Sequence, residues 1–248
     1  MAHMYKIIKW IKYMRTNFET LCIWSGILCT VVLFIGWWPI ANFFPPHSPI
    51  SDADFIAAIY QENTNAIRFG CLLIIISGGL YVPFNAVIAT QLKRIKSPET
   101  RVIVYTQICC GAAGTLFFLL PGLSWTIAAF RPDRAVEITQ TLNDTGWILL
   151  VMPFALFSVQ DLAIGGLILS DRSKEKIFPR WIGFFNLWCA ILFIPGGLLT
   201  FFKVGPFAWD GILAFWIPGL IFFTWFYVMS YGLFRAVSKQ NRLSKTTI

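Results

Sequence analysis

The sequence predicts an all-α, multi-pass membrane protein with six transmembrane helices, and three observations carry that prediction. Of the 248 residues, 57% are hydrophobic and only 13% are charged, and the mean hydropathy is +0.67, far from the composition of soluble domains. Six apolar runs have the length of a membrane span. The basic residues gather in every second loop. Residues 1–248 are therefore expected to form a single transmembrane domain.

The six apolar runs are bounded by charged residues and are apolar on all faces. A helix needs about 20 apolar residues to cross a hydrocarbon core of about 30 Å, and every run meets that length. A β-barrel would instead show weaker segments of about ten residues with alternating polarity. The predicted spans lie near Leu21–Phe44, Ile67–Thr90, Val102–Phe130, Trp147–Ser170, Trp181–Phe202 and Gly211–Phe234.

Lysine and arginine show on which side of the membrane the loops lie. The N-terminal segment, the second loop, the fourth loop and the C-terminal tail hold four basic residues each, 16 of the 20 in the chain. The positive-inside rule places these segments and both termini in the cytoplasm, which predicts a plasma (inner) membrane location. The net charge of +8 then reflects contact with anionic lipid headgroups, and nucleic-acid binding is not expected.

The N-terminal segment, residues 1–20, carries its basic residues among aromatic and aliphatic ones. Between Tyr5 and Phe18 this pattern is typical of a helix lying in the cytoplasmic interface, and a simple basic flank of the first span is the alternative. The first apolar run is as long as a full span, so it is expected to remain in the protein rather than to be cleaved as a signal peptide.

Each predicted span contains one proline. Proline removes a backbone hydrogen bond and bends a helix, so six bent spans are expected. The odd-numbered spans also share a Leu-Phe pair, a proline and later aromatic residues, which predicts three parallel helical hairpins; chance resemblance among Phe-rich helices is the alternative. The six prolines are Pro39, Pro83, Pro121, Pro153, Pro195 and Pro218.

Two short helices are expected to cap the outer ends of the spans. Asp52 stands where a helix N-cap would be, before apolar residues at helical spacing, and Asn63-Thr64-Asn65 follows. The second expected helix runs over Val136–Leu142 and is followed by Asn143-Asp144-Thr145.

The residues give no support for cofactor chemistry. Apart from His3, the chain has one histidine, His47 in an outer turn, whereas membrane haem, copper and di-iron sites draw on several imidazoles. The six cysteines lie in the spans without a Cys-x-x-Cys pair. The glycine pairs lack the phosphate-binding pattern and predict close helix packing instead. No cofactor, metal or catalytic residue is predicted.

Asp161 is the one acidic residue deep inside a predicted span, about 15 Å from the cytoplasmic charge layer, and an ionisable group at that depth is a functional candidate. Several polar side chains fall in the same half of the membrane and would form a pocket if their helix faces met. Interhelical hydrogen bonding without a ligand is the alternative for the amides. The predicted ligand-binding residues are Asp161, Asn85, Gln107, Asn186, Tyr227 and Gln160.

The favoured function is binding or transport of a small, mostly apolar molecule in an intramembrane pocket around Asp161, with the carboxyl protonated or hydrogen-bonded. The alternative is a non-catalytic subunit or assembly partner of a membrane enzyme complex, which short loops and a large aromatic surface suit equally. An enzyme acting on a lipid is less favoured, since it would need Asp161 with Tyr227 as its acid–base pair. Expected partners are membrane lipids, an apolar small molecule and another membrane protein. Trp188, Trp216 and Trp225 are candidates for lining a pocket or a partner surface.

Overall fold

In the computed structural model the chain is described over residues 2–246, with side chains described for residues 18–242, and no β-strand occurs in that range. Short π- and 3-10-helical segments, labelled η, follow α1 and α8 and precede α9. The elements are α1 (Ala2–Ile35), η1 (Gly36–Ile40), α2 (Ala53–Glu62), α3 (Thr64–Leu92), α4 (Thr100–Gly114), α5 (Leu116–Phe130), α6 (Val136–Val151), α7 (Phe154–Ser170), α8 (Arg180–Leu192), η2 (Ile194–Phe201), η3 (Ile212–Trp216) and α9 (Ile217–Thr246).

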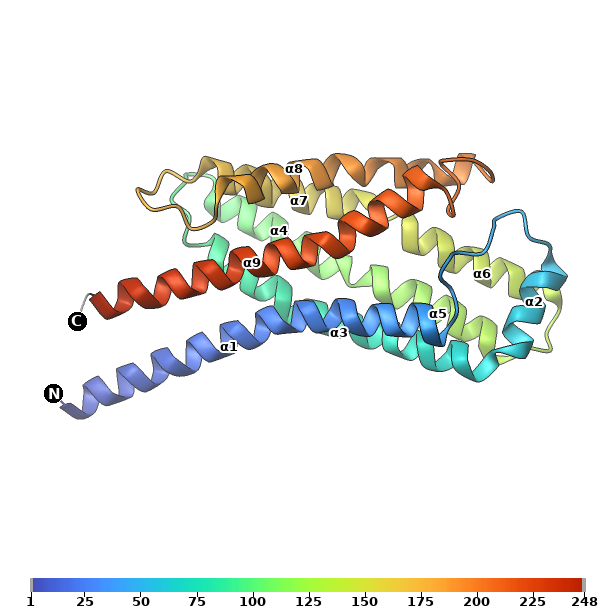
Figure 1. Ribbon diagram of the computed structural model, residues 1–248, viewed down its shortest axis with the longest axis horizontal. Helices are drawn as coiled ribbons and strands as arrows, with labels where there is room; N and C mark the ends of the chain where they lie inside the picture. Colours follow the sequence, from blue (N-terminus) through green and yellow to red (C-terminus); the bar gives the residue numbers. More distant parts are fainter. Residues whose placement is uncertain (1, 247–248) are drawn as a thin grey trace.

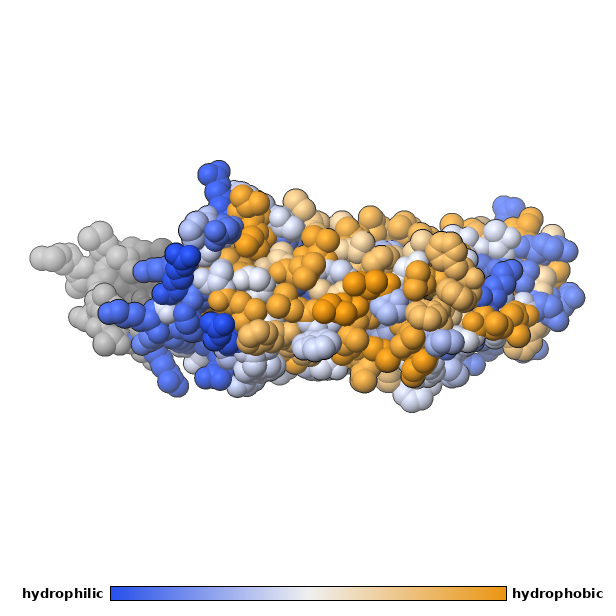
Figure 2. Space-filling model, turned by 90° about the horizontal axis from the view of Figure 1, so that it is seen from above, coloured by the Kyte–Doolittle hydropathy of each residue, from blue (hydrophilic) through white to orange (hydrophobic). Residues whose placement is uncertain are grey.

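Six helical segments within residues 18–242 are long and apolar enough to cross a membrane, so the chain is an α-helical, multi-pass membrane protein. The surface agrees with this assignment, because a broad apolar belt separates two polar ends (Figure 2). The segments are Phe18–Ile40, Thr64–Leu92, Thr100–Phe130, Val136–Ser170, Arg180–Phe201 and Ile212–Arg242.

The spans pack as an elongated bundle. Helix α1 lies along α3, α7 lies along α8, and α9 contacts both α1 and α8 (Figure 1). Helix α4 packs on α7, while α5 packs on α3 and α6. The first and last helices run to the same end of the bundle, which also carries the 93–99 and 171–179 loops and is called the basic end (Figure 1). The opposite end carries α2 and is called the α2 end.

The first predicted cap helix is present as α2, and the Asp52 Oδ1 accepts a hydrogen bond from the Phe55 N–H at 2.8 Å, as an N-cap should. The second is not a separate helix, because Val136–Leu142 forms the first turns of the continuous helix α6. Asn143 does not end the helix there. Its buried side chain accepts a hydrogen bond from the Tyr60 hydroxyl at 3.2 Å, which ties α6 to α2.

Irregular turns occur beside four of the six span prolines. One proline lies in the π-helical turn η1, one separates α6 from α7, one begins the 3-10 helix η2, and one follows the π-helical turn η3. The other two lie inside α3 and α5. A bend at every span therefore stays a prediction. The four prolines at irregular turns are Pro39, Pro153, Pro195 and Pro218.

The predicted interfacial segment, residues 1–20, coincides with the first turns of α1 as far as the backbone is described. The side chains up to residue 17 lie outside the described residues, so burial of an apolar face in the interface stays a prediction. Outside the described residues also lie the side chains of His3, of the tail lysine Lys245 and of the four basic residues of this segment, Lys6, Lys9, Lys12 and Arg15.

The 171–179 loop at the basic end folds around one buried carboxylate. Asp171 accepts hydrogen bonds from the backbone N–H groups of Ser173 at 2.9 Å and Ile177 at 3.0 Å. Burial alone would favour the neutral acid, but these hydrogen bonds and the nearby Lys176 ammonium outweigh it. The pKa of Asp171 consequently lies below its ordinary value.

Replacing Asp171 with asparagine is expected to cost about 2 kcal/mol of stability at neutral pH, because charged hydrogen bonds are lost. A lowered folded-state pKa means that the carboxylate stabilises the fold above the unfolded pKa of about 3.9 and that this contribution disappears as the pH falls through the folded pKa. Thermal unfolding in detergent at neutral and acid pH measures the difference. Glu175→Gln, in the same exposed loop, is the control, and an equal cost of Asp171→Asn at both pH values would contradict the prediction.

Candidate functional site

Three of the predicted site residues meet in one buried cluster between α3, α4 and α7. Asn85 Oδ1 accepts hydrogen bonds from Gln160 Nε2 at 2.8 Å and from Gln107 Nε2 at 3.1 Å. Tyr81 donates its hydroxyl to Gln160 Oε1 at 3.1 Å, a partner that the sequence analysis did not find. All four side chains are buried. Tyr81, Asn85, Gln107 and Gln160 are called the amide cluster.

The local sequence explains how these polar groups come together. Tyr81 and Asn85 are four residues apart and share one face of α3, where the Asn85 Nδ2 also donates to the Tyr81 carbonyl at 3.3 Å. On α4, Gln107 and Gly111 share the facing side. A Cβ atom at Gly111 would overlap Asn85 Oδ1, so the glycine gives the asparagine its place. Helices α3 and α4 can therefore approach closely enough for the amides to bond.

Asp161 lies beside the amide cluster on α7 and is only 2% exposed. Its Oδ2 has no hydrogen-bond partner among the described residues. The carboxyl interacts with the Trp225 side chain of α9, and it is close enough to Tyr81 and to Cys189 of α8 for electrostatic contact. One oxygen of a buried acid is thus left for a further partner.

Trp225 connects Asp161 to another predicted site residue, Asn186. The Trp225 indole Nε1 donates to Asn186 Oδ1 at 3.0 Å, and Asn186 Nδ2 donates to the Ile182 carbonyl at 2.7 Å. Asp161, Asn186, Cys189 and Trp225 are called the acid site. It adjoins the amide cluster, because Gln160 and Asp161 are neighbours in the chain.

Tyr227 lies outside both groups. It is 49% exposed, and its hydroxyl accepts a hydrogen bond from Thr30 Oγ1 of α1 at 3.3 Å. Two residues along a helix correspond to a rotation of about 200°, so Tyr227 faces away when Trp225 faces Asp161. The structure brings the other five predicted residues together and leaves Tyr227 apart. The acid–base pair that a lipid enzyme would need is not formed.

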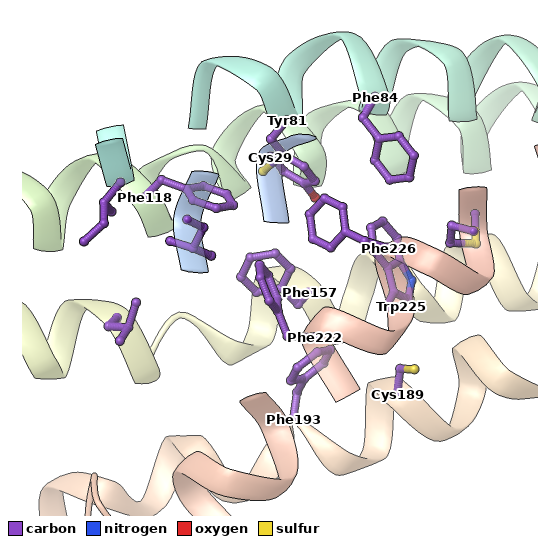
Figure 3. Packing of buried hydrophobic residues seen from close by; sticks show 14 of the residues in the cluster. Cys29, Tyr81, Phe84, Phe118, Phe157, Cys189, Phe193, Phe222, Trp225 and Phe226 are labelled. Carbon is purple, nitrogen blue, oxygen red and sulfur yellow. The ribbon is translucent and has the colours of Figure 1, made fainter. Parts of the chain in front are cut away.

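An apolar cavity of about 70 Å³ lies one helical turn from Asp161, toward the α2 end. Three phenylalanines that line the cavity, one from α7, one from the C-cap of α8 and one from α9, each lie about one helical turn from a residue of the acid site. Figure 3 shows these three rings beside Trp225 and Cys189, and the Phe157 centroid lies 5.9 Å from the Phe193 centroid and 5.8 Å from the Phe222 centroid. The pairs are Phe157 with Asp161, Phe193 with Cys189 and Phe222 with Trp225.

One residue of the cavity lining carries a buried polar atom without a partner in the described part of the chain. Trp37 of η1 lines the cavity, is 8% exposed, and its indole Nε1 has no hydrogen-bond partner among residues 18–242. The rest of the lining is mainly aromatic and aliphatic, with Phe117 and Phe215 among it. The cavity is therefore an apolar space with the Trp37 indole among its walls and a buried acid beyond the layer formed by Phe157, Phe193 and Phe222.

A second buried polar network, which the sequence analysis missed, lies nearer the basic end. Gln91 Nε2 donates to Glu19 Oε2 and to Gln240 Oε1, both at 3.2 Å. Arg94 donates to Gln91 Oε1 and, at 3.1 Å, to the Ala236 carbonyl. The network joins α1, α3 and α9. Glu19 is an acidic residue in an otherwise basic segment, and this was the signal in the sequence that could have revealed the network.

The described histidine, His47, belongs to an aromatic cluster at the α2 end, with its ring 5.6 Å from Phe43 and 6.4 Å from Trp147. Among residues 18–242 no group of three or more His, Cys, Asp or Glu residues lies close enough to hold a metal ion. The six cysteines are free thiols, and all but Cys109 are buried.

Comparison of the chain with protein-family models, with curated proteins and with solved structures gave no significant match.

Proposed function

We propose that the protein binds, or carries across the membrane, a small and mostly apolar molecule in the intramembrane region around Asp161. The observation that carries this proposal is the unpaired Oδ2 of a fully buried acid, one helical turn from an apolar cavity. An apolar pocket with a few convergent polar groups is the usual form of a small-molecule site. A carboxyl group that lacks a full set of hydrogen-bond partners inside a membrane costs free energy, so such a residue is a functional candidate unless shown otherwise.

The ligand would place its apolar part in the cavity and its polar end at Asp161. A cavity of about 150 Å³ in another protein holds benzene, and the present space is about half as large. A ring-sized ligand therefore requires one of the separating phenylalanines to turn aside. Phe222 is the one on α9, next to the half-exposed stretch Pro218–Gly219. Ligand access between α9 and its neighbours follows from this arrangement.

The test uses two probes of similar size, 4-fluorophenol and fluorobenzene, followed by fluorine NMR in detergent. Asp161→Leu is expected to weaken fluorophenol about tenfold, the equivalent of one strong hydrogen bond, and to leave fluorobenzene unchanged. Asp161→Asn, which keeps a polar group, should weaken fluorophenol less. Ala214→Val narrows the cavity from η3 and should weaken both probes. Asp144→Asn, at a half-buried acid on α6, is the matched control.

Two results would count against the proposal. The first is that Asp161→Leu binds 4-fluorophenol as tightly as the wild type does, with fluorobenzene binding also unchanged. The second is loss of the fold in both Asp161 variants, which would make the acid a structural partner of Trp225. Thermal unfolding separates the cases, and it can be followed by the reaction of a thiol dye with the buried cysteines in a Cys109→Ser background.

We further propose that both termini face the cytoplasm of a plasma (inner) membrane, that each span bends at its proline, and that the spans form three parallel hairpins. The concentration of basic residues in alternate segments supports the orientation. The irregular turns beside four prolines support the bends. The shared Leu-Phe and proline pattern of the odd-numbered spans supports the hairpins.

A role as a non-catalytic subunit of a membrane enzyme complex is the second proposal, and Trp188 favours it. This side chain lies near the middle of the α8 span, where lipid-facing tryptophan is uncommon, and it is 63% exposed. A partner helix would cover it. Stoichiometric co-purification of another membrane protein would support this role, and a solitary particle with bound ligand would support the first.

A further inference from the structure

A groove of about 890 Å³ lies at the basic end, between the loop that precedes α8 and the last turns of α9. One glycine explains how the two elements come together. A Cβ atom at Gly232 would lie 2.7 Å from Ile182 Cδ1 and 3.1 Å from Phe178 Cδ1, so its absence lets α9 approach the start of α8. That approach places Tyr231 and Arg235 beside the loop. We call this space the basic groove.

Four cations line the basic groove, whereas Glu175 is the one acid among its lining residues. Lys239 Nζ is paired with Glu175 Oε2 at 3.0 Å. Glu175 is itself 65% exposed, so this pair is screened and weak. The cations that line the groove are Lys176, Arg235, Lys239 and Arg242.

Two of these cations bond to neutral oxygen atoms. Lys176 Nζ donates to the Asp171 backbone carbonyl, and Arg235 donates to the Tyr231 hydroxyl at 3.0 Å. The Arg235 guanidinium also lies 5.7 Å from the centre of the Tyr231 ring. The nearby Asp171 carboxylate is turned inward to the backbone of its own loop. When the Glu175 and Asp171 carboxylates are subtracted from the four lining cations, the groove keeps a net charge of +2.

The groove lies where the apolar belt meets the polar end of the molecule. Tyr231 is 47% exposed and Trp181 is 48% exposed, and their ring centroids are 6.0 Å apart. Exposed Tyr and Trp side chains of this kind gather at the level of lipid headgroups. Phe178 and Phe234 supply an apolar wall next to the cations. The combination of fixed cations, interfacial aromatics and apolar surface matches one chemical class, a lipid with an anionic headgroup.

We propose that the basic groove binds the phosphate-bearing headgroup of an anionic phospholipid from the leaflet at the basic end. Arg235 and Lys176 would contact the phosphate, because their side-chain hydrogen bonds go to neutral oxygens and the Asp171 carboxylate near Lys176 is turned to the backbone of its own loop. The acyl chains would run along Tyr231 and Phe234 into the bilayer. The site is separate from the acid site and does not depend on the proposed function of Asp161.

The test titrates the full-length protein in detergent with dioctanoyl phosphatidylglycerol and follows thermal unfolding. Dioctanoyl phosphatidylcholine and inorganic phosphate are titrated in parallel. Phosphatidylglycerol should stabilise the wild type, and the other two should not. In the double variant Arg235→Gln, Lys176→Gln the apparent affinity should fall about 25-fold, since each cation near a membrane surface contributes about fivefold.

The matched control removes the same charge from the same end outside the groove, as Lys93→Gln with Arg101→Gln, two exposed positions. It should leave the affinity for phosphatidylglycerol unchanged. If the double variant unfolds too early, Arg235→Gln alone, at an exposed site, should show the fivefold loss. Equal losses in groove and control variants, or equal stabilisation by phosphatidylcholine, would overturn the proposal. Equal stabilisation by inorganic phosphate would overturn it in favour of a soluble anion.

Discussion

Replacing Gly165 with alanine should destabilise the protein by about 1–3 kcal/mol, whereas the same change at its neighbour Gly166 should cost nothing. A Cβ atom at Gly165 would lie 2.8 Å from the Gly183 carbonyl oxygen and 3.0 Å from Leu187 Cδ2. The carbonyl belongs to the backbone of α8 and cannot turn aside as a side chain could. Helices α7 and α8 would have to separate, and the acid site takes Asp161 from one and Asn186 from the other.

Gly166 is the matched control because it lies on the same helix, one residue further, and a Cβ atom there meets nothing within 4 Å. Alanine is the better helix former, so Gly166→Ala should leave stability unchanged or raise it by up to about 1 kcal/mol. Thermal unfolding in detergent, with the thiol dye as reporter, measures both variants. Equal stabilities of the two variants would mean that α7 and α8 are not in close contact at Gly165.

The two glycines illustrate what the sequence can and cannot predict. The Gly165-Gly166 pair predicts close helix packing, but the residue types do not say which member faces the neighbour. The same is true of Gly78-Gly79, where a Cβ at Gly78 would lie 2.8 Å from Phe118 Cβ and one at Gly79 meets nothing within 4 Å. The rotation of each helix about its axis decides which glycine faces the neighbouring helix. These spans are apolar on all faces. Without a polar side, the sequence does not reveal the rotation.

The six spans could be predicted from the sequence, whereas the directions in which their polar side chains point could not. A fixed rise of 1.5 Å per residue allowed residues to be placed by counting from the charged ends, and the six spans followed from length and hydropathy alone. Trp225 and Tyr227 are two residues apart on the same span, but only Trp225 interacts with Asp161. The sequence predicts a helix from Val136, where α6 begins, but not its continuation into the span, because Asn143 reads as a helix stop until its hydrogen-bond partner Tyr60, distant in the sequence, is known.

Asn85→Leu is the other substitution for which we expect a large effect, a loss of about 2–3 kcal/mol. Asn85 Oδ1 accepts from both Gln107 and Gln160, so its removal leaves two buried amide donors without a partner. The cost of an orphaned donor exceeds the value of the bond itself, which averages below about 1 kcal/mol between membrane helices. Thr106→Val on α4, whose hydroxyl donates to the Val102 carbonyl of its own helix, is the control and should cost little.

Replacing Asn85, Gln107 and Gln160 together by leucine in a Tyr81→Phe background should be less harmful than Asn85→Leu alone, since neither an amide donor nor the Tyr81 hydroxyl, which donates to Gln160, is then orphaned. A triple variant that folds also separates the two roles of the polar residues. If it still binds 4-fluorophenol, the amide cluster serves to hold α3, α4 and α7 together, and Asp161 alone receives the ligand. If the variant folds but loses that binding, the ligand site extends to the amide cluster. A triple variant less stable than Asn85→Leu would contradict the expectation, because it would show that packing of the amide side chains outweighs their hydrogen bonds.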